Sequence, residues 1–197
     1  MTFHRIKRGL IGNEEYTGEV VVASLGIPPE VEAAVIGERP KPSVHTEPLR
    51  GEPILASACL LGINCRYDGR NSLNKKVVAL AKEKTLIPVC PEQLGGLGTP
   101  RDYMWISGGK GSDVLDGRAR VLNAKNEDVT ESLIRGAREV LKIARAWGAK
   151  KAILKARSPS CGCWKIYGDK GKLIDGDGVT AALLKREGIK IITEEEL

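Results

Sequence analysis

The sequence predicts an α/β fold built on a mostly parallel sheet with helices on both faces. From residue 53 onward, short apolar segments alternate with segments whose apolar residues recur at helical spacing. That alternation is typical of βαβ units, in which parallel strands are covered by the helices that connect them. A length of 197 residues with 42% hydrophobic residues is enough for one main domain.

Five short apolar segments are the predicted strands of this domain. They are PILASA (53–58), TLIPVC (85–90), RARVL (118–122), KAILKA (151–156) and IKIIT (189–193). Apolar runs of this length, bounded by turn residues, are typical of buried strands. The segment KIYGDKGKLI (165–174) predicts a small additional hairpin.

Three segments, 71–84, 128–147 and 178–187, have the periodicity of amphipathic helices. The second begins at Asp128 and Glu131, whose spacing is that of a capping box. We therefore expect a long helix between the third and fourth predicted strands.

The first fifty residues differ in character from the rest. The segment 18–27 predicts a strand and 28–37 a short helix, and prolines and charges then mark a linker. We predict that residues 1–50 form an N-terminal extension and that residues 51–197 form the α/β domain.

Charge and composition narrow the class of protein. The 31 Lys and Arg residues exceed the 25 Asp and Glu residues, so the net charge is +6, which suits an anionic substrate or a nucleic acid. No apolar run approaches the roughly 20 residues of a membrane helix. The start of the chain also lacks the apolar core of a secretory signal. We expect a cytoplasmic protein without membrane contact, and no feature indicates an obligate protein partner.

Three of the five cysteines follow predicted strands. Cys59 comes directly after the first, Cys90 ends the second, and Cys161 lies shortly after the fourth. Parallel strands end at one edge of the sheet, where open α/β sheets bind ligands. We therefore expect these three cysteines in one pocket. In a reducing compartment they favour a metal or catalytic role over disulfides.

The residues leave three alternatives for this pocket. A zinc site needs a fourth ligand, which Cys65 or Cys163 would supply. An iron–sulfur cluster on three thiolates keeps one iron open, which is typical of a catalytic centre and suits a substrate sulfur atom. The third alternative is that the cysteines simply pack as small hydrophobic residues.

Several motifs, in this order, resemble the thiouracil desulfurase family from about residue 53 to the end of the chain. They are SACLLG (57–62), CRYDG (65–69), IPVCPEQLGGL (87–97), DVLDG (113–117), AILKARSPSCG (152–162) and GDGVTAALL (176–184). The resemblance implies a Rossmann-like domain with a 4Fe-4S cluster on Cys59, Cys90 and Cys161. Separately, residues 8–37 resemble the closing strand of the epimerase domain that repairs hydrated nicotinamide cofactors, without that domain's catalytic core.

The same resemblance implies a reaction and two catalytic residues. The family removes sulfur from thiolated pyrimidines without redox chemistry. Glu92 matches a position that takes a proton from the attacking water, and Ser158 matches one that contacts the ring or orients that water. Cys65 is expected to be a packed thiol. Cys163 departs from the small residue usual at its position and introduces a competing ligand.

Weaker signals concern the rest of the substrate. Arg66 and Asp68 are candidate substrate contacts, with a simple turn ion pair as the alternative. Arg101 is a candidate phosphate contact, with Tyr103 or Trp105 stacking on a base. The helix start in GDGVT offers an anion site, although Asp177 is read more simply as a helix cap.

We therefore predict an iron–sulfur-dependent desulfidase that acts on free thiouracil or 4-thio-UMP. An alternative keeps the chemistry but makes the substrate 4-thiouridine in tRNA, which the positive charge would help to bind. A second alternative is a non-catalytic module that binds zinc or a cluster.

Overall fold

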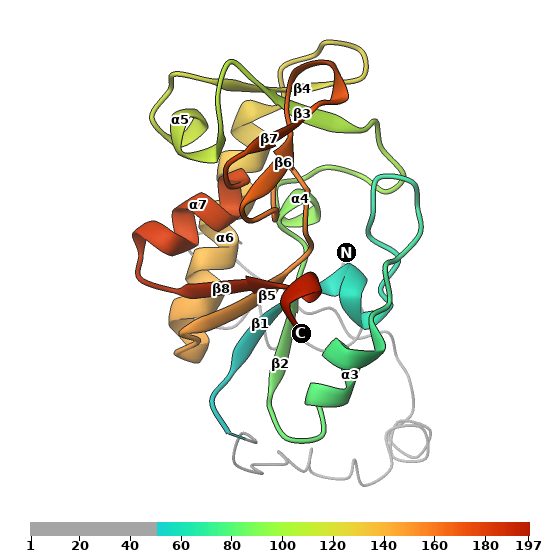
Figure 1. The fold of residues 1–197 in the computed structure, drawn as a ribbon, viewed down its shortest axis with the longest axis vertical. Coiled ribbons are helices and arrows are strands. Elements are labelled where there is room, and N and C mark those ends of the chain that lie inside the picture. The colour runs from blue at the N-terminus through green and yellow to red at the C-terminus, as the bar shows by residue number, and fades with distance from the viewer. Residues whose placement is uncertain (1–50) are drawn as a thin grey trace, which may run out of the picture. The chain divides into compact units, whose positions relative to one another are not determined.

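The computed structural model describes residues 51–197 (Figure 1). The predictions for residues 1–50, including the extra strand and the resemblance of residues 8–37 to an epimerase fragment, lie outside the described residues. Within residues 51–197, no helix combines the length and the apolar character needed to cross a membrane.

Four parallel strands form the central sheet, in the spatial order β2-β1-β5-β8. They are β1 (Ile54–Ser57), β2 (Leu86–Val89), β5 (Lys151–Leu154) and β8 (Lys190–Thr193). Each lies inside a segment predicted as a strand, so the predicted α/β fold is confirmed. Because β2 and β5 lie on opposite sides of β1, the direction of chain progression switches between β1 and β5.

Helices cover both faces of this sheet (Figure 1). On one face α6 (Thr130–Trp147) and α7 (Val179–Arg186) pack over a core that includes Leu55 and Leu154. On the other face the short η2 (Ala58–Leu61) and α3 (Lys75–Leu80) pack over Ala56 and Ile153. Successive strand residues point to opposite faces, so each four-residue strand contributes to both cores.

A second region is built from antiparallel strands and short helices. Its strands are β3 (Met104–Ser107), β4 (Arg120–Asn123), β6 (Lys165–Tyr167) and β7 (Leu173–Asp175). The remaining short helical elements of residues 51–197 are α4 (Pro91–Leu94), α5 (Gly111–Leu115), η3 (Asp169–Gly171) and η4 (Glu194–Glu196). The predicted hairpin at 165–174 is confirmed as β6 and β7. The predicted strand at 118–122 overlaps β4, but β4 pairs with β3 outside the parallel sheet.

Two helix starts differ from the sequence prediction. The helix predicted at 71–84 is confined to α3, because the Asn74 side chain accepts the N–H groups of Lys76 and Val77 and so caps a helix that begins there. The predicted capping box at Asp128 and Glu131 does not start α6. Instead, Asp128 Oδ1 accepts the N–H of Thr130 at 2.9 Å, just before the helix.

Candidate active site

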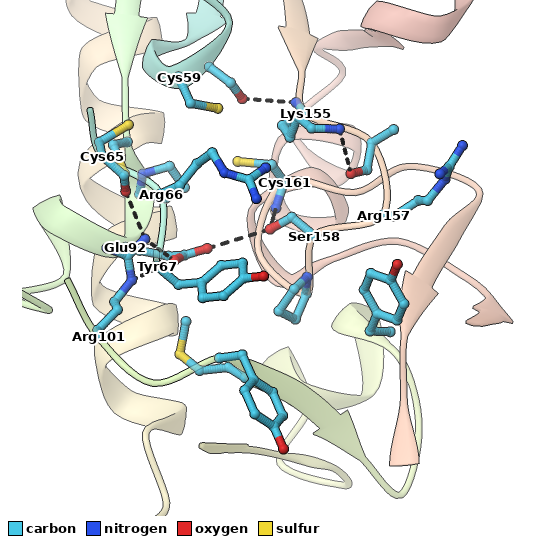
Figure 2. Close-up of a pocket in the computed structure, with 18 of the residues that line it drawn as sticks. Cys59, Cys65, Arg66, Tyr67, Glu92, Arg101, Lys155, Arg157, Ser158 and Cys161 are labelled. Carbon is cyan, nitrogen blue, oxygen red and sulfur yellow. Dashed lines mark hydrogen bonds and ion pairs between the residues drawn. The ribbon is translucent and has the colours of Figure 1, made fainter. Parts of the chain in front are cut away.

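A cavity of about 440 Å³ opens at the carboxyl edge of the central sheet (Figure 2). Its wall includes Ser57 at the end of β1, Val89 at the end of β2 and Lys155 directly after β5. The cavity therefore lies at the switch between β1 and β5, which is where open α/β sheets bind their ligands.

Four cysteines line this cavity. Cys59 lies in η2 directly after β1, Cys90 is the N-cap residue of α4 directly after β2, and Cys161 lies in the loop after β5. The strand order thus brings the three predicted ligands together. Cys65 lies in the same wall, and the sulfur atoms of Cys59, Cys65 and Cys161 point toward a common space in Figure 2.

Hydrogen bonding and burial raise the pKa values of three of these thiols, Cys65, Cys90 and Cys161. Hydrogen bonding to Cys59, together with burial, raises the pKa of Cys65 to about 11. Hydrogen bonding to Cys65 and burial raise the pKa of Cys90 well above its usual range, and burial does the same for Cys161. A cysteine binds metal as the thiolate, which the metal stabilises. Cys65, Cys90 and Cys161 are therefore soft donors whose raised pKa values favour the thiol until a metal stabilises the thiolate.

The start of α7 holds the loop that carries Cys161. Three consecutive N–H groups, at residues 178–180, donate to carbonyl oxygens within residues 159–162 at 2.8–2.9 Å. A Cβ on Gly178 would lie 2.5 Å from the carbonyl oxygen of Ser160, so a larger residue cannot approach the loop in this way.

This arrangement corrects the prediction of an anion site in GDGVT, because the N–H groups of the helix start are used by protein carbonyls. Asp177 does not cap the helix through its side chain either. Its carboxylate accepts the N–H of Trp164 and pairs with Lys185, while Gly178 is the N-cap residue.

Glu92 and Arg101 form a buried ion pair in the cavity wall. Arg101 Nε donates to Glu92 Oε2 at 2.8 Å, and its Nη2 contacts the same oxygen. Nη2 also donates to the carbonyl oxygen of Cys65 at 2.9 Å, and Nη1 donates to Gly98 O and Thr99 Oγ1. The guanidinium has five N–H donors and makes five contacts to protein acceptors. Arg101 therefore lines the cavity with its guanidinium engaged by Glu92 and by neighbouring protein oxygens, and its contact with a phosphate stays a prediction.

Ser158 lies opposite Glu92, with all of its hydrogen-bonding positions engaged. Its Oγ accepts the N–H groups of Ser160 and Cys161 at 3.1 and 3.2 Å. The hydroxyl donates to Glu92 Oε1 across 3.5 Å, which is a long bond. Because both lone pairs serve the loop, the hydroxyl hydrogen is the part of Ser158 that a substrate or water can recruit.

Arg66 and Asp68 form the turn ion pair that was the alternative to substrate contact. Arg66 Nε and Nη2 donate to the two carboxylate oxygens of Asp68 at 3.1 Å each, and Nη1 donates to Ser72 Oγ at 2.8 Å. Hydrogen bonding from Arg66 holds the pKa of Asp68 far below its usual range. Arg66 lines the cavity, whereas Asp68 supports it from behind.

The outer part of the cavity is aromatic and charged. Tyr67, Tyr103, Trp105 and Tyr167 line it, and the rings of Tyr103 and Trp105 lie 5.9 Å apart. Aromatic rings arranged in this way offer a surface on which a planar ligand can stack.

Two further cations, Lys155 and Arg157, also belong to this wall. Lys155 pairs with Glu194 and Arg157 with Glu195, and both carboxylates belong to η4.

Comparison with known proteins identifies the family to which this arrangement belongs. A family model described as 2-thiouracil desulfurase matches residues 54–196, which include the whole central sheet and every residue that lines the cavity. The chain belongs to the 2-thiouracil desulfurase family. The predicted family resemblance is thereby confirmed.

Two individual proteins are similar over most of their own length. The uncharacterized protein YbbK of Bacillus subtilis (strain 168) is 49% identical over 146 residues, which cover 73% of this chain and 97% of YbbK. A solved structure of the 4Fe-4S-dependent thiouracil desulfidase TudS matches with a TM-score of 0.64 and 38% sequence identity. That match covers 74% of this chain and 93% of the TudS chain.

The donor set of this family member suits an iron–sulfur cluster. Among residues 51–197, no three His, Cys, Asp or Glu side chains are grouped tightly enough to hold a single metal ion. A cluster is bound differently, through one thiolate on each of several irons, so its cysteines stand around a volume. The cavity presents soft sulfur donors around such a volume, and sulfur is the ligand that iron–sulfur clusters use.

Cys163 lies apart from the cavity wall. It is buried beside Lys185 and Asp177, and burial raises the pKa of its thiol despite the opposing effect of Lys185. The predicted competition between Cys163 and Cys161 for a metal therefore has no geometric support in this structure.

Sequence reasoning did not single out Lys155, Arg157, Tyr67 or Tyr167, although each lines the cavity. Lys155 and Arg157 follow β5 in AILKARSPSCG, and Tyr67 lies in CRYDG. The rule that ligands bind beyond the carboxyl ends of strands applies to the first two as it does to Cys161.

Proposed function

We propose that the protein removes sulfur from a thiolated uracil and replaces it with oxygen, without a net change in oxidation state. One observation carries the proposal: a single cavity holds a set of cysteines next to Glu92, a carboxylate fixed by a buried arginine. In the net reaction, the C=S group of the substrate and one water molecule give a C=O group and hydrogen sulfide.

Cys59, Cys90 and Cys161 are the residues that we assign to a 4Fe-4S cluster, by their place in the family motifs and in the cavity. When bound, the cluster supplies a Lewis-acidic iron for the thiocarbonyl sulfur, which makes the adjoining carbon a better electrophile. Cys65 lies among these residues as a fourth thiol, and we assign it no role as a ligand.

Glu92 is the general base in this proposal. Its Oε2 is held by Arg101, which leaves Oε1 facing Ser158 and available to a water molecule. Glu92 takes a proton from that water while the oxygen adds to the substrate carbon, and Ser158 directs its hydroxyl hydrogen to Glu92 or to the water. The carbon–sulfur bond then breaks with its electron pair on sulfur, which leaves as hydrosulfide.

The pairing of the cavity's charges favours a free, neutral base as the substrate. Arg66, Arg101, Lys155 and Arg157 line the cavity, and each is paired with a carboxylate of this chain. A neutral thiouracil needs only the stacking surface and the inner residues. A phosphate, by contrast, must compete with a carboxylate for every one of these cations.

The exposed aromatic rings favour a second candidate, 4-thiouridine within tRNA. Tyr103 is 57% exposed and Tyr67 is 44% exposed at the cavity, so either ring can stack on a base that belongs to a longer strand. Binding to tRNA would weaken steeply with salt, whereas binding of free thiouracil would not. Turnover of both substrates at low and high salt separates the two candidates.

The first experiment is to measure iron, acid-labile sulfide and thiouracil turnover in protein purified without oxygen. About four iron and four sulfide per chain are expected for a four-iron cluster. Cys90→Ser should lose both together with turnover, while Cys163→Ser, a matched change outside the cavity, should keep them. Zinc, or no metal, would refute the proposal. If the protein carries the cluster but turns over no thiolated pyrimidine, the result would support a non-catalytic cluster-binding module instead.

A further inference from the structure

Ser57 is a buried polar residue at the inner end of the cavity. It is the last residue of β1, it is only 2% exposed, and it lines the cavity wall. A polar side chain buried this deeply is hydrogen-bonded in native proteins. The proposed reaction uses no atom of Ser57, although the residue stands at the strand end from which the cavity is built.

The Ser57 hydroxyl continues the pairing between β1 and β5. The last paired residues of these strands are Ala56 and Ile153. Just beyond them, Ser57 Oγ accepts the N–H of Lys155 at 2.9 Å. Because this contact uses a lone pair of the oxygen, the hydroxyl hydrogen is left to find an acceptor of its own.

The sulfur of Cys161 is that acceptor. Cys161 is 6% exposed and lines the same cavity as Ser57. Burial raises the pKa of the Cys161 thiol, and a hydrogen bond with the Ser57 side chain opposes that rise. A donor acts in this direction because it stabilises the thiolate. The contact is therefore strongest when the sulfur is ionised, since hydrogen bonds to a charged acceptor are roughly twice as strong as neutral ones.

From this geometry we propose that Ser57 donates its hydroxyl hydrogen to the Cys161 sulfur in the cluster-loaded protein and so tunes the electron density of the cluster. The donor draws negative charge from the thiolate, which then gives less of it to iron. Hydrogen bonds to the sulfurs are among the factors that set the potential of an iron–sulfur cluster. Ser57 is thus a positioning residue that acts through a ligand. The inference rests on the proposed function, because it takes Cys161 as a cluster ligand.

The test measures the midpoint potential for one-electron reduction of the cluster, by redox titration followed spectroscopically. In Ser57→Ala the donor is gone, so the reduced and more negative cluster loses stabilisation. At a fixed potential, the ratio of oxidised to reduced cluster should rise about tenfold, which corresponds to a midpoint about 59 mV lower. Ser57→Thr keeps a hydroxyl on the same carbon atom and should retain most of the original potential.

Ser160→Ala is the matched control. Ser160 precedes Cys161 directly and is fully buried, but it does not line the cavity, and its Oγ lies 3.1 Å from Thr180 Oγ1. Its loss removes a structural hydrogen bond from the same loop. We expect this variant to unfold at a lower urea concentration and to keep the potential of the unsubstituted protein. A shift as large as that of Ser57→Ala would show that loop packing sets the potential, and would overturn the inference.

A second measurement needs no variant that might fail to fold. The cluster is reconstituted in H₂O and in D₂O, and the iron–cysteine sulfur stretching frequencies of the unsubstituted protein are compared by resonance Raman spectroscopy. A hydrogen-bonded sulfur should shift on deuteration. The absence of any shift would overturn the inference, as would an unchanged potential in Ser57→Ala.

Turnover of thiouracil is measured in parallel, so that the two proposals are tested separately. A protein that binds no cluster would refute both, because Cys161 would then be no ligand. A cluster-loaded protein that shows the predicted change of potential but turns over no thiolated pyrimidine would refute the reaction and retain the role of Ser57.

Discussion

The inner and outer ends of the cavity are built in different ways. At the inner end, the cysteines sit at strand ends or in loops that are fixed by backbone hydrogen bonds, as the contact of α7 with residues 159–162 shows. At the outer end, aromatic rings and long charged side chains from several loops form the wall, and their contacts are made largely by side chains.

This difference indicates that the inner end of the cavity holds the reacting groups and that the mouth contacts the rest of the substrate. Side chains fixed by the backbone keep the geometry that a metal and a general base require, because the main chain of a packed sheet hardly moves. Side chains at the mouth can change without disturbing the sheet. We therefore expect changes at the inner end to abolish the reaction, and changes at the mouth to alter which substrate is preferred.

The largest effect is expected from removing the base at the inner end. Glu92→Gln keeps the size of the side chain and a hydrogen bond to Arg101, but it cannot take a proton. The rate constant kcat should fall by roughly 10²–10⁴-fold, with iron and sulfide content unchanged. Single-turnover kinetics with thiouracil measure this directly. Normal turnover in this variant would show that another group acts as the base.

A smaller but still severe effect is expected from pushing the Cys161 loop away from α7. Gly178→Ala puts a methyl group 2.5 Å from the Ser160 carbonyl oxygen, so the loop or the helix must shift. Overpacking of this kind costs about 1–3 kcal/mol. Urea denaturation measures the loss, and iron content should fall with it.

Gly98→Ala is the matched control for that change, because its added Cβ comes no closer than 3.9 Å to any atom outside its own neighbours. It should leave the free energy of unfolding within about 0.5 kcal/mol of the unsubstituted protein. Equal destabilisation of the two variants would contradict the assigned role of the α7 contact.

Arg101→Met tests the support of the base without removing it. Loss of the guanidinium frees Glu92 Oε2 and leaves the Cys65 carbonyl oxygen without its donor. We expect kcat to fall about tenfold with little change in KM, the pattern of a group that positions another. Added guanidinium ion should restore part of the rate in this variant and not in Glu92→Gln. If KM rises instead while kcat is kept, Arg101 binds substrate after all.

The smallest effect is expected at the mouth. Tyr103→Ala removes an exposed ring that is available for stacking, and KM for thiouracil should rise by about two- to fivefold with kcat unchanged. Trp147→Ala, an exposed ring on α6 that does not line the cavity, should leave KM as it is. A large drop in kcat for Tyr103→Ala would erase the functional distinction between the two ends.

Much of the fold and part of the site followed from local patterns. The four strands of the parallel sheet and the helices α6 and α7 lie within segments whose apolar spacing predicted them. The positions of Cys59, Cys90 and Cys161 after three of the predicted parallel strands predicted their convergence, because parallel strands share one carboxyl edge. What failed were local features with long-range partners. β4 pairs with β3 and not with the sheet, and the N–H groups at 178–180 bind a loop and not an anion.

By itself, the sequence determined the alternating elements, the motif order of the family and the chemical types gathered at the sheet edge. Only the tertiary structure decided how those groups are used. In the structure, Arg101 is the partner of Glu92. Cys65 lies in the cavity wall and Cys163 lies outside it. The carboxylates of Glu194 and Glu195 in η4 pair with Lys155 and Arg157. The physical reason is that apolar periodicity depends on residues close together in the sequence. The partner of a charged or hydrogen-bonding group depends instead on which distant segment the fold places next to it.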